Sequence, residues 1–321
     1  MQKTTLGSTK GSPPPATLNP FFGLTRRLAA LWPKHATGVV LAVAAAGVFA
    51  VSAAHANTPT STLYLLDWNP TPVAYNEYTD TLITVQGGTG AMSLAPMQSE
   101  DAAIAVTNSI KTLSWNAFGV VDAGSQYTLN GTYTGTTYPV PSAVQGASFF
   151  DGASDGTNNY AVDHGTGNVW KFNGNWANPQ LLFTASDSSS LGIAYDTTNN
   201  TLWISNDSFD SSSIYHYSLT GTLLGSFQLA DSGNTFYTGL ALDPADNTLW
   251  IFDYADGADA MDQYSKDGTF LGQLSLAGAD PGAIIFGAEF AEATPTPIPG
   301  ALLLFGPGLA ALAFVRRRFG K

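Results

Sequence analysis

Short runs of alternating apolar and polar residues fill the middle of the chain and recur at a fixed spacing. Residues 192–225 align without a gap with residues 239–272, an offset of 47. Both copies contain Gly-x-Ala-x-Asp, Asn-Thr-Leu-Trp-Ile, Tyr-Ser and Gly-Thr-x-Leu-Gly in the same order. Alternation with a period of two is typical of strands with one buried face. Each copy therefore predicts four short strands joined by turns.

Four-stranded units with a period in the forties predict the blades of a β-propeller. Residues 61–67 match the second strand of the last copy, 247–253, but no first strand precedes them. Residues 286–290 follow the last first strand by about one period and supply the missing one. We therefore expect an all-β propeller in which the C-terminal strand completes the N-terminal blade and so protects the sheet edges.

The predicted body, residues 57–293, has room for five repeats of 47 residues. Six blades are the alternative if the irregular region 86–146 hides two, and an open β-sandwich is the competing architecture. The repeat resembles the blades of NHL-type propellers, although no family-specific box is present. We expect helices only in the two terminal segments.

Charge divides the chain into three parts. Residues 1–56 carry five basic side chains and residues 294–321 carry four, and neither part contains an acid. The body holds all 24 acidic residues against three bases, Lys111, Lys171 and Lys266, a formal net charge of −21. Such a body argues against nucleic-acid binding, which needs Lys and Arg to neutralise phosphate. The absence of Cys excludes a disulfide scaffold, a thiol nucleophile and Cys-ligated metals.

The N-terminal part has the composition of a secretory signal peptide. Residues 38–54 are 17 uncharged residues rich in Ala and Val, basic residues precede them, and Ala54-His55-Ala56 follows. A small-x-small triplet after an apolar run is the pattern of a signal peptidase site. We predict a signal peptide over residues 1–56, recognised by the secretion machinery, with a permanent membrane anchor as the alternative.

The C-terminal part, residues 294–321, combines three features in order. A Pro-rich spacer ends in Pro297-Ile298-Pro299, residues 300–315 are apolar or small, and Arg316, Arg317 and Arg318 follow. The apolar run predicts a short transmembrane helix in the inner membrane with its basic end in the cytoplasm.

This order of features resembles a PEP-CTERM sorting signal, in the variant with Val-Pro-Leu-Pro-Ala in place of the usual Val-Pro-Glu-Pro. The resemblance implies that an exosortase-type transpeptidase cleaves near Pro297–Pro299 and releases or reattaches the body at the cell surface. Bacteria with such signals are typically Gram-negative and make exopolysaccharide. An ordinary C-terminal anchor helix is the alternative.

Candidate chemistry in the body is sparse. Asp253, Asp256, Asp259 and Asp262 place four carboxylates in ten residues and are weak candidates for binding Ca²⁺, against a plain solvated acidic loop. His164 lies in a predicted turn. His216 occupies a third-strand position that is Lys171 or Gln263 in neighbouring units, which suggests a solvated strand face. No Gly-x-Ser-x-Gly motif or metal-spaced histidine pair occurs, so we name no catalytic residue.

These observations favour an exported surface or extracellular-matrix protein whose propeller is a non-enzymatic binding or structural module, with polysaccharide as the candidate partner. Trp203 and Trp250 recur at one repeat position, which favours packing between blades. One of the less regular tryptophans is the candidate for stacking on a sugar: Trp68, Trp115, Trp170 or Trp176. The alternative is a secreted propeller hydrolase or lyase acting on polysaccharide or a lactone, with Ca²⁺ as its candidate cofactor.

Overall fold

The computed structural model describes residues 58–69, 79–98, 101–114, 123–206, 212–230, 237–253 and 259–291. All of them belong to the larger of the two units into which the chain divides, residues 52–321. They form twenty strands, in five antiparallel four-stranded sheets, and one short 3-10 helix, η2 (Ser142–Val144). The predicted terminal helices lie outside these ranges.

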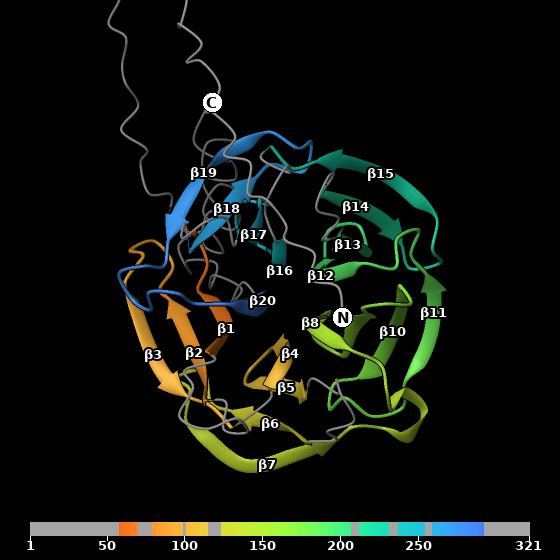
Figure 1. Cartoon of the computed structure of the whole chain (residues 1–321), viewed down its shortest axis with the longest axis horizontal. Helices are drawn as coiled ribbons and strands as arrows, with labels where there is room; N and C mark the ends of the chain where they lie inside the picture. The colour runs from red at the N-terminus through yellow and green to blue at the C-terminus, as the bar shows by residue number, and fades with distance from the viewer. Residues whose placement is uncertain are drawn as a thin grey trace, which may run out of the picture. The chain divides into compact units, whose positions relative to one another are not determined.

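The five sheets are the blades of a ring, as Figure 1 shows in a view down its axis. From the axis outward, blade one contains β20 (Ile285–Phe290), β1 (Leu63–Asn69), β2 (Thr79–Val85) and β3 (Met92–Pro96). Blade two contains β4 (Asp101–Val106), β5 (Ile110–Ser114), β6 (Ala123–Tyr127) and β7 (Tyr133–Pro139). Blade three contains β8 (Phe149–Ser154), β9 (Asn158–Asp163), β10 (Asn168–Asn173) and β11 (Gln180–Thr184).

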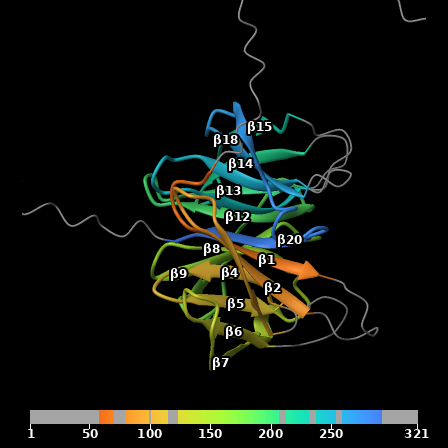
Figure 2. The ribbon, with the colours of Figure 1, turned by 90° about the vertical axis from the view of Figure 1, so that its left-hand side faces the viewer.

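Blades four and five are the two copies that align best in the sequence. Blade four contains β12 (Ser190–Asp196), β13 (Thr201–Asn206), β14 (Ser213–Ser218) and β15 (Leu223–Gln228). Blade five contains β16 (Tyr237–Leu242), β17 (Leu249–Asp253), β18 (Ala260–Tyr264) and β19 (Phe270–Ser275). The structure confirms five blades rather than six, and region 86–146 contributes blade two and the outermost strand of blade one. Figure 2 shows the sheets from the side.

The C-terminal strand closes the ring as predicted. β20 pairs antiparallel with β1, so that Leu63 lies opposite Phe290 and Leu65 opposite Ala288. A second contact ties the start of the body to blade five, because the Asp243 carboxylate accepts hydrogen bonds from the N–H groups of Thr60 (2.9 Å) and Ser61 (3.0 Å). Segments from both ends of the body therefore join where blade one meets blade five.

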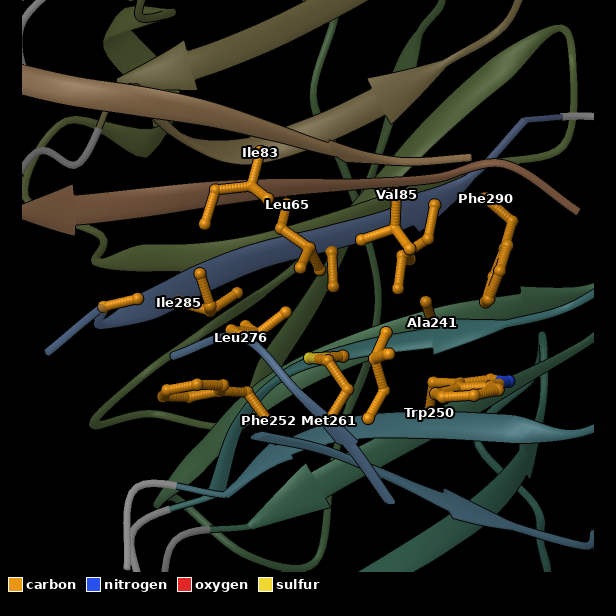
Figure 3. Close-up of a cluster of buried hydrophobic side chains, with 14 residues drawn as sticks. Leu65, Ile83, Val85, Ala241, Trp250, Phe252, Met261, Leu276, Ile285 and Phe290 are labelled. Carbon is orange, nitrogen blue, oxygen red and sulfur yellow. The ribbon is translucent and has the colours of Figure 1, made fainter. Parts of the chain in front are cut away.

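The core consists of one apolar cluster at each interface between neighbouring blades. The recurring tryptophans belong to two of them: Trp203 packs between blades four and five, and Trp250 packs between blades five and one. Figure 3 shows the second cluster, in which Trp250 and Met261 face Leu65 and Phe290. The recurrence of these tryptophans thus marks packing between blades, as the sequence suggested.

A recurring tyrosine adds a polar link between neighbouring blades. The hydroxyl oxygens of Tyr127, Tyr217 and Tyr264, all on third strands, accept backbone N–H groups that follow the outermost strand of the preceding blade. The donors are Gln98 (2.8 Å), Ser186 (3.1 Å) and Ala230 (3.3 Å), respectively. Each link satisfies a partly buried N–H, which would otherwise cost free energy. Phe172 takes this position in blade three and has no hydroxyl, so the third blade departs from the repeat.

Turn glycines allow the blades to approach closely at the rim. Gly221 and Gly268 have positive φ angles of 81° and 89°. A Cβ at these positions would lie 2.6 Å from Cβ of Phe183 and 2.7 Å from Cβ of Phe227. Only glycine fits both the left-handed backbone and the neighbouring outer strand.

Candidate functional site

The centre of the ring is occupied by a single carboxyl group, that of Asp151 on β8. Its Oδ1 accepts the N–H groups of Gly152 (2.8 Å) and Ala288 (2.9 Å). Its Oδ2 accepts those of Ile193 (2.9 Å) and Leu240 (2.8 Å). These donors come from four of the five innermost strands, so the group lies at the axis and binds four blades to one another.

Burial shapes the electrostatics of this group. Asp151 is completely buried, and burial raises the pKa of its carboxyl to about 8, while the four backbone N–H donors each act in the opposite direction. Both oxygens already accept two hydrogen bonds. Asp151 is therefore placed to hold the blades together rather than to contact a ligand.

The innermost strands surround the axis of the ring, and we call its two ends, where these strands begin and end, the mouths of the central channel. The mouth where the strands end contains a small cavity. Glu289 on β20 lines it, and its carboxylate accepts the N–H groups of Val106 and of Ser154 (2.5 Å). Tyr195 and Asn247 also line the cavity, whose volume is about 40 Å³. A water molecule needs roughly 10–15 Å³ by this measure, so the space accommodates a few waters and no sugar ring.

The opposite mouth, where the innermost strands begin, carries a cluster of partly exposed rings. We call Trp68, Phe150, His164 and Phe286 the aromatic patch. Phe286 lies 5.4 Å from Trp68 and 4.9 Å from Phe150, measured between ring centroids. The His164 ring meets Phe150 edge to face at 5.3 Å. None of the four rings is fully buried, so the patch offers apolar faces to solvent.

Beside Trp68, at the end of β1, lies a buried carboxyl group. Asp67 is inaccessible to solvent, and its Oδ1 accepts the N–H of Ile284 at 2.7 Å. Burial, with smaller contributions from the carboxyl of Asp280 and the charge of Asp259, raises the pKa of Asp67 to about 8, against the opposing hydrogen bond from Ile284. Asp67 thus holds a proton to higher pH in the folded chain than in the unfolded one.

The proposed calcium ligands are only partly described. Asp256 lies outside the described residues, while Asp253, Asp259 and Asp262 are buried. Asp259 Oδ2 accepts the N–H of Gly282 (2.7 Å), and Asp262 Oδ1 accepts from the Gln273 side chain (3.1 Å). No group of three or more His, Cys, Asp or Glu in the described ranges is arranged to hold a metal ion. Calcium binding by the full set stays a prediction.

The two histidines have different surroundings. His164 lies in a turn, as predicted, and belongs to the aromatic patch. His216 stacks on Trp203 with centroids 4.0 Å apart, and its Nε2 lies 2.7 Å from Oγ1 of Thr201. Burial lowers the pKa of His216 and so favours the neutral imidazole.

The interpretation of the His216 position as a solvated strand face was wrong for one of the three residues that occupy it, Gln263, whereas His216 and Lys171 are partly exposed. His216 is covered on one side by Trp203, and Gln263 in blade five is buried and donates from Nε2 to Oγ1 of Thr248 at 2.9 Å. The alternation of the third strand could not reveal this, because the partner lies on the second strand. Lys171, the third occupant, has no such bond.

The tryptophans proposed for sugar stacking separate clearly. Trp176 is completely buried, and Trp170 packs against the core between blades two and three. Trp115 lies outside the described residues. Trp68 alone among the described three belongs to the aromatic patch. Phe150 and Phe286 were not anticipated, because the residues that bring them together are far apart in the sequence.

The predicted processing residues lie outside the described part of the chain. They are Ala54, Ala56, Pro297, Ile298, Pro299, Arg316, Arg317 and Arg318. Residues 300–315 lie outside it too, and none of the helical structure within the described ranges is long and apolar enough to cross a membrane. Signal cleavage, membrane anchoring and sorting stay predictions.

Comparison with known proteins yields distant structural neighbours only. No protein-family model matches the chain, and no curated protein matches it. A chain of a nidogen/laminin complex is 11% identical with a TM-score of 0.46, covering 71% of this chain and 97% of its own. Glutaminyl cyclase from Myxococcus xanthus is 15% identical with a TM-score of 0.44, covering 61% and 82%. TolB from Acinetobacter baumannii is 13% identical with a TM-score of 0.44, covering 74% and 68%. Similarity at this level says nothing about what the chain binds.

Proposed function

We propose that this chain is an exported cell-surface or matrix protein whose propeller is a non-enzymatic polysaccharide-binding module. In this proposal the aromatic patch contacts the sugars. Export rests on the signal-peptide pattern of residues 1–56, and surface sorting rests on the PEP-CTERM resemblance of residues 294–321. The observation that carries the binding role is the cluster of partly exposed rings at one mouth of a channel that is closed at its centre.

Aromatic rings at a surface provide flat apolar area with little loss of conformational entropy on binding. The C–H faces of sugar rings match such a surface, and the polar edges of the sugar stay in water. Trp68 and Phe286 lie close enough to form one continuous platform. The neighbouring His164 adds ring nitrogens that can exchange hydrogen bonds with sugar hydroxyls.

The burial of Asp151 at the axis and the small size of the cavity beside Glu289 favour a binding role over catalysis. The Asp151 carboxyl is sealed from solvent by four blades, and the cavity at the opposite mouth has only about 40 Å³. A hydrolase needs two carboxyl groups flanking a sugar bond in an open site. Neither Asp151 nor the small cavity beside Glu289 provides that arrangement.

The binding role is tested by titrating the exported protein with soluble glucan, galactan and mannan oligosaccharides in a calorimeter. We expect Trp68→Ala and Phe286→Ala each to weaken binding at least tenfold. Phe270→Ala is the matched control, because Phe270 is an exposed ring on the outer strand β19, away from the patch. Absence of binding to the whole panel, or an equal loss in the control, contradicts the role of the patch. Release of reducing ends on incubation would support the enzymatic alternative instead.

The sorting proposal is tested by the mass of the mature protein in a Gram-negative host that carries an exosortase. We expect the mature chain to begin at Asn57 and to end near Pro297. Replacing Pro297 and Pro299 with Ala should leave the C-terminal segment attached. A parent protein that keeps Lys321 in that host contradicts processing.

A further inference from the structure

One position of the repeat is closed in blades four and five and open in blade three. In blade four His216 on the third strand bonds to Thr201 on the second, and in blade five Gln263 bonds to Thr248. The strand registers place Lys171 of blade three at the equivalent position. Lys171 lies opposite Tyr160 on the second strand, just as His216 lies opposite Trp203. Thr201 lies two residues before Trp203, and the residue two places before Tyr160 in blade three is Asn158. Asn158 is therefore the blade-three equivalent of Thr201.

No hydrogen bond joins Asn158 to Lys171. Asn158 Nδ2 donates instead to Oδ2 of Asp155 at 2.9 Å. A cavity of about 220 Å³ opens beside the pair, near the rim of blade three, where Figure 1 shows β10 and β11. We call it the Lys171 pocket; it is lined by Asn158, Lys171, Phe172, Asn173, Asn178 and Gln180.

Lys171 differs from the other two lysines of the body. Lys111 Nζ donates to the carbonyl oxygen of Gly174 at 2.6 Å, and Lys266 Nζ pairs with Asp196 at 2.7 Å. Within the described residues, the Lys171 ammonium has neither a hydrogen bond nor an ion pair. In a body with 24 acids and three lysines, an ammonium without an acidic partner is notable.

The nearby acid does not compete for this ammonium. Asp155 accepts hydrogen bonds from the N–H groups of Thr157 and Asn158, from the Asn158 amide and from the Tyr160 hydroxyl. Burial raises the pKa of Asp155, but these donors outweigh burial and hold it below its usual value. The carboxylate is thus already satisfied by donors other than Lys171.

The rest of the pocket suits a hydroxyl-rich ligand. The carboxamides of Asn173, Asn178 and Gln180 provide both donors and acceptors. Pockets for drug-sized ligands typically measure about 300–1,000 Å³, so this smaller volume fits a single sugar unit. A carboxylate on that sugar would be the natural partner of Lys171.

The turn that forms one side of the pocket is preorganised. Trp176 in this turn is completely buried and packs edge to face on Phe172 at 5.3 Å. Asn178 is held in the left-handed region at φ 52°, and Asn173 Oδ1 accepts the N–H of Ala177 at 2.8 Å. A fixed turn loses little entropy when a ligand binds.

We propose that the Lys171 pocket is a second ligand site that binds one uronic-acid unit of an acidic saccharide. The site is separate from the aromatic patch, and it rests on the proposed function only for the class of ligand. The body is strongly negative, but its distant charges are screened beyond about 8 Å at physiological ionic strength. Close contact with Lys171 then decides the preference for an anionic over a neutral sugar.

The test compares methyl glucuronide, methyl glucoside and acetate as ligands of the exported protein, followed by NMR titration. We expect glucuronide to bind at least tenfold more tightly than either of the others. Lys171→Gln should abolish this preference, because it removes the positive charge and introduces a residue that occupies the same position in blade five. Lys171→Arg keeps the charge and should retain the preference. Lys266→Gln is the control for an equal change in net charge.

Three results would overturn the proposal. They are equal binding of glucuronide and glucoside by the parent protein, equal binding of acetate, and an equal loss in Lys171→Gln and Lys266→Gln. Trp68→Ala distinguishes the two sites, because it should weaken oligosaccharide binding at the aromatic patch and leave glucuronide binding unchanged. Failure of one site therefore does not imply failure of the other.

Discussion

The axis and the rim of this propeller each present one conspicuous polar group, and the two groups have opposite surroundings. Asp151 at the axis is completely buried and accepts four backbone N–H groups from four blades. Lys171 near the rim is partly exposed, lines an open pocket and has no partner within the described residues. Because both oxygens of Asp151 already accept hydrogen bonds from the protein, we assign Asp151 a structural role. Because the ammonium of Lys171 has no partner among the described residues, we propose that Lys171 binds a ligand.

The comparison also explains why the ring needs a polar group at its centre. The innermost strands turn one edge toward the axis, where N–H groups of that edge would be buried without partners. A single carboxyl group with two acceptor oxygens satisfies four of these donors at once. The rim, by contrast, is solvated, so an unpaired ammonium there costs little.

The largest expected effect comes from Asp151→Asn. The amide nitrogen of Asn cannot accept, so two of the four backbone donors lose their partner, and each buried unsatisfied group costs about 1–3 kcal/mol. We expect the free energy of unfolding to fall by about 3–5 kcal/mol, measured by guanidinium denaturation of the exported protein. Asp267→Asn, the same change in an exposed turn, should leave the midpoint unchanged. A loss below about 1 kcal/mol would contradict the role of Asp151 as the link between blades.

His216→Ala and Lys171→Ala compare one repeat position in two blades. His216 loses its stacking on Trp203 and its bond to Thr201, so we expect a cost of about 1–2 kcal/mol. The Lys171 ammonium has no partner to lose among the described residues, and its replacement should change stability by less than about 0.5 kcal/mol. Denaturation midpoints of the two variants measure the difference. Similar costs would show that both positions are equally packed, which contradicts the open pocket.

The pH dependence of stability tests the buried Asp67. Its pKa is raised to about 8 in the folded chain, whereas an unfolded Asp titrates near 4. Between these values the folded chain binds the extra proton, so the free energy of unfolding falls as the pH rises from about 4 to 8. Asp67→Asn removes this proton uptake and should make the dependence less steep, and the slope that remains comes from the buried Asp151, whose pKa is also raised to about 8. Asp280→Asn should reduce the slope by a smaller amount. Denaturation midpoints at pH 5.5, 6.5 and 7.5 give the slopes; an unchanged slope in Asp67→Asn contradicts the assignment.

Most of the fold follows from the sequence because blade packing repeats. Trp203 and Trp250 recur at an offset of 47 and fill equivalent interfaces, and the unmatched strand at 61–67 required a partner, which β20 provides. Blade two was harder to predict. Its second strand carries Lys111 where blades four and five have Trp, and so it lacks the strongest marker of the repeat.

The candidate sites were less predictable, because their partners are backbone groups or distant side chains. Asp151 lies in an ordinary Phe-Phe-Asp-Gly sequence, and the N–H groups of Ile193, Leu240 and Ala288 leave no mark in the residue pattern. The variation among Lys171, His216 and Gln263 was visible. Its meaning depended on pairing with the second strand, which only the register reveals.

The smallest expected change in stability comes from closing the Lys171 pocket with the residues of blade five. Asn158→Thr combined with Lys171→Gln recreates the pair formed by Thr248 and Gln263. The new hydrogen bond replaces the one that Asn158 Nδ2 donates to Asp155, so we expect the free energy of unfolding to change by less than about 0.5 kcal/mol. The same variant should lose glucuronide binding, because both the cation and the open space are gone. Asn158→Thr alone keeps the ammonium and should retain part of the binding. If the double variant is as stable as the parent and binds glucuronide like the parent, the ligand sits elsewhere, and the open position in blade three is only a local departure from the repeat.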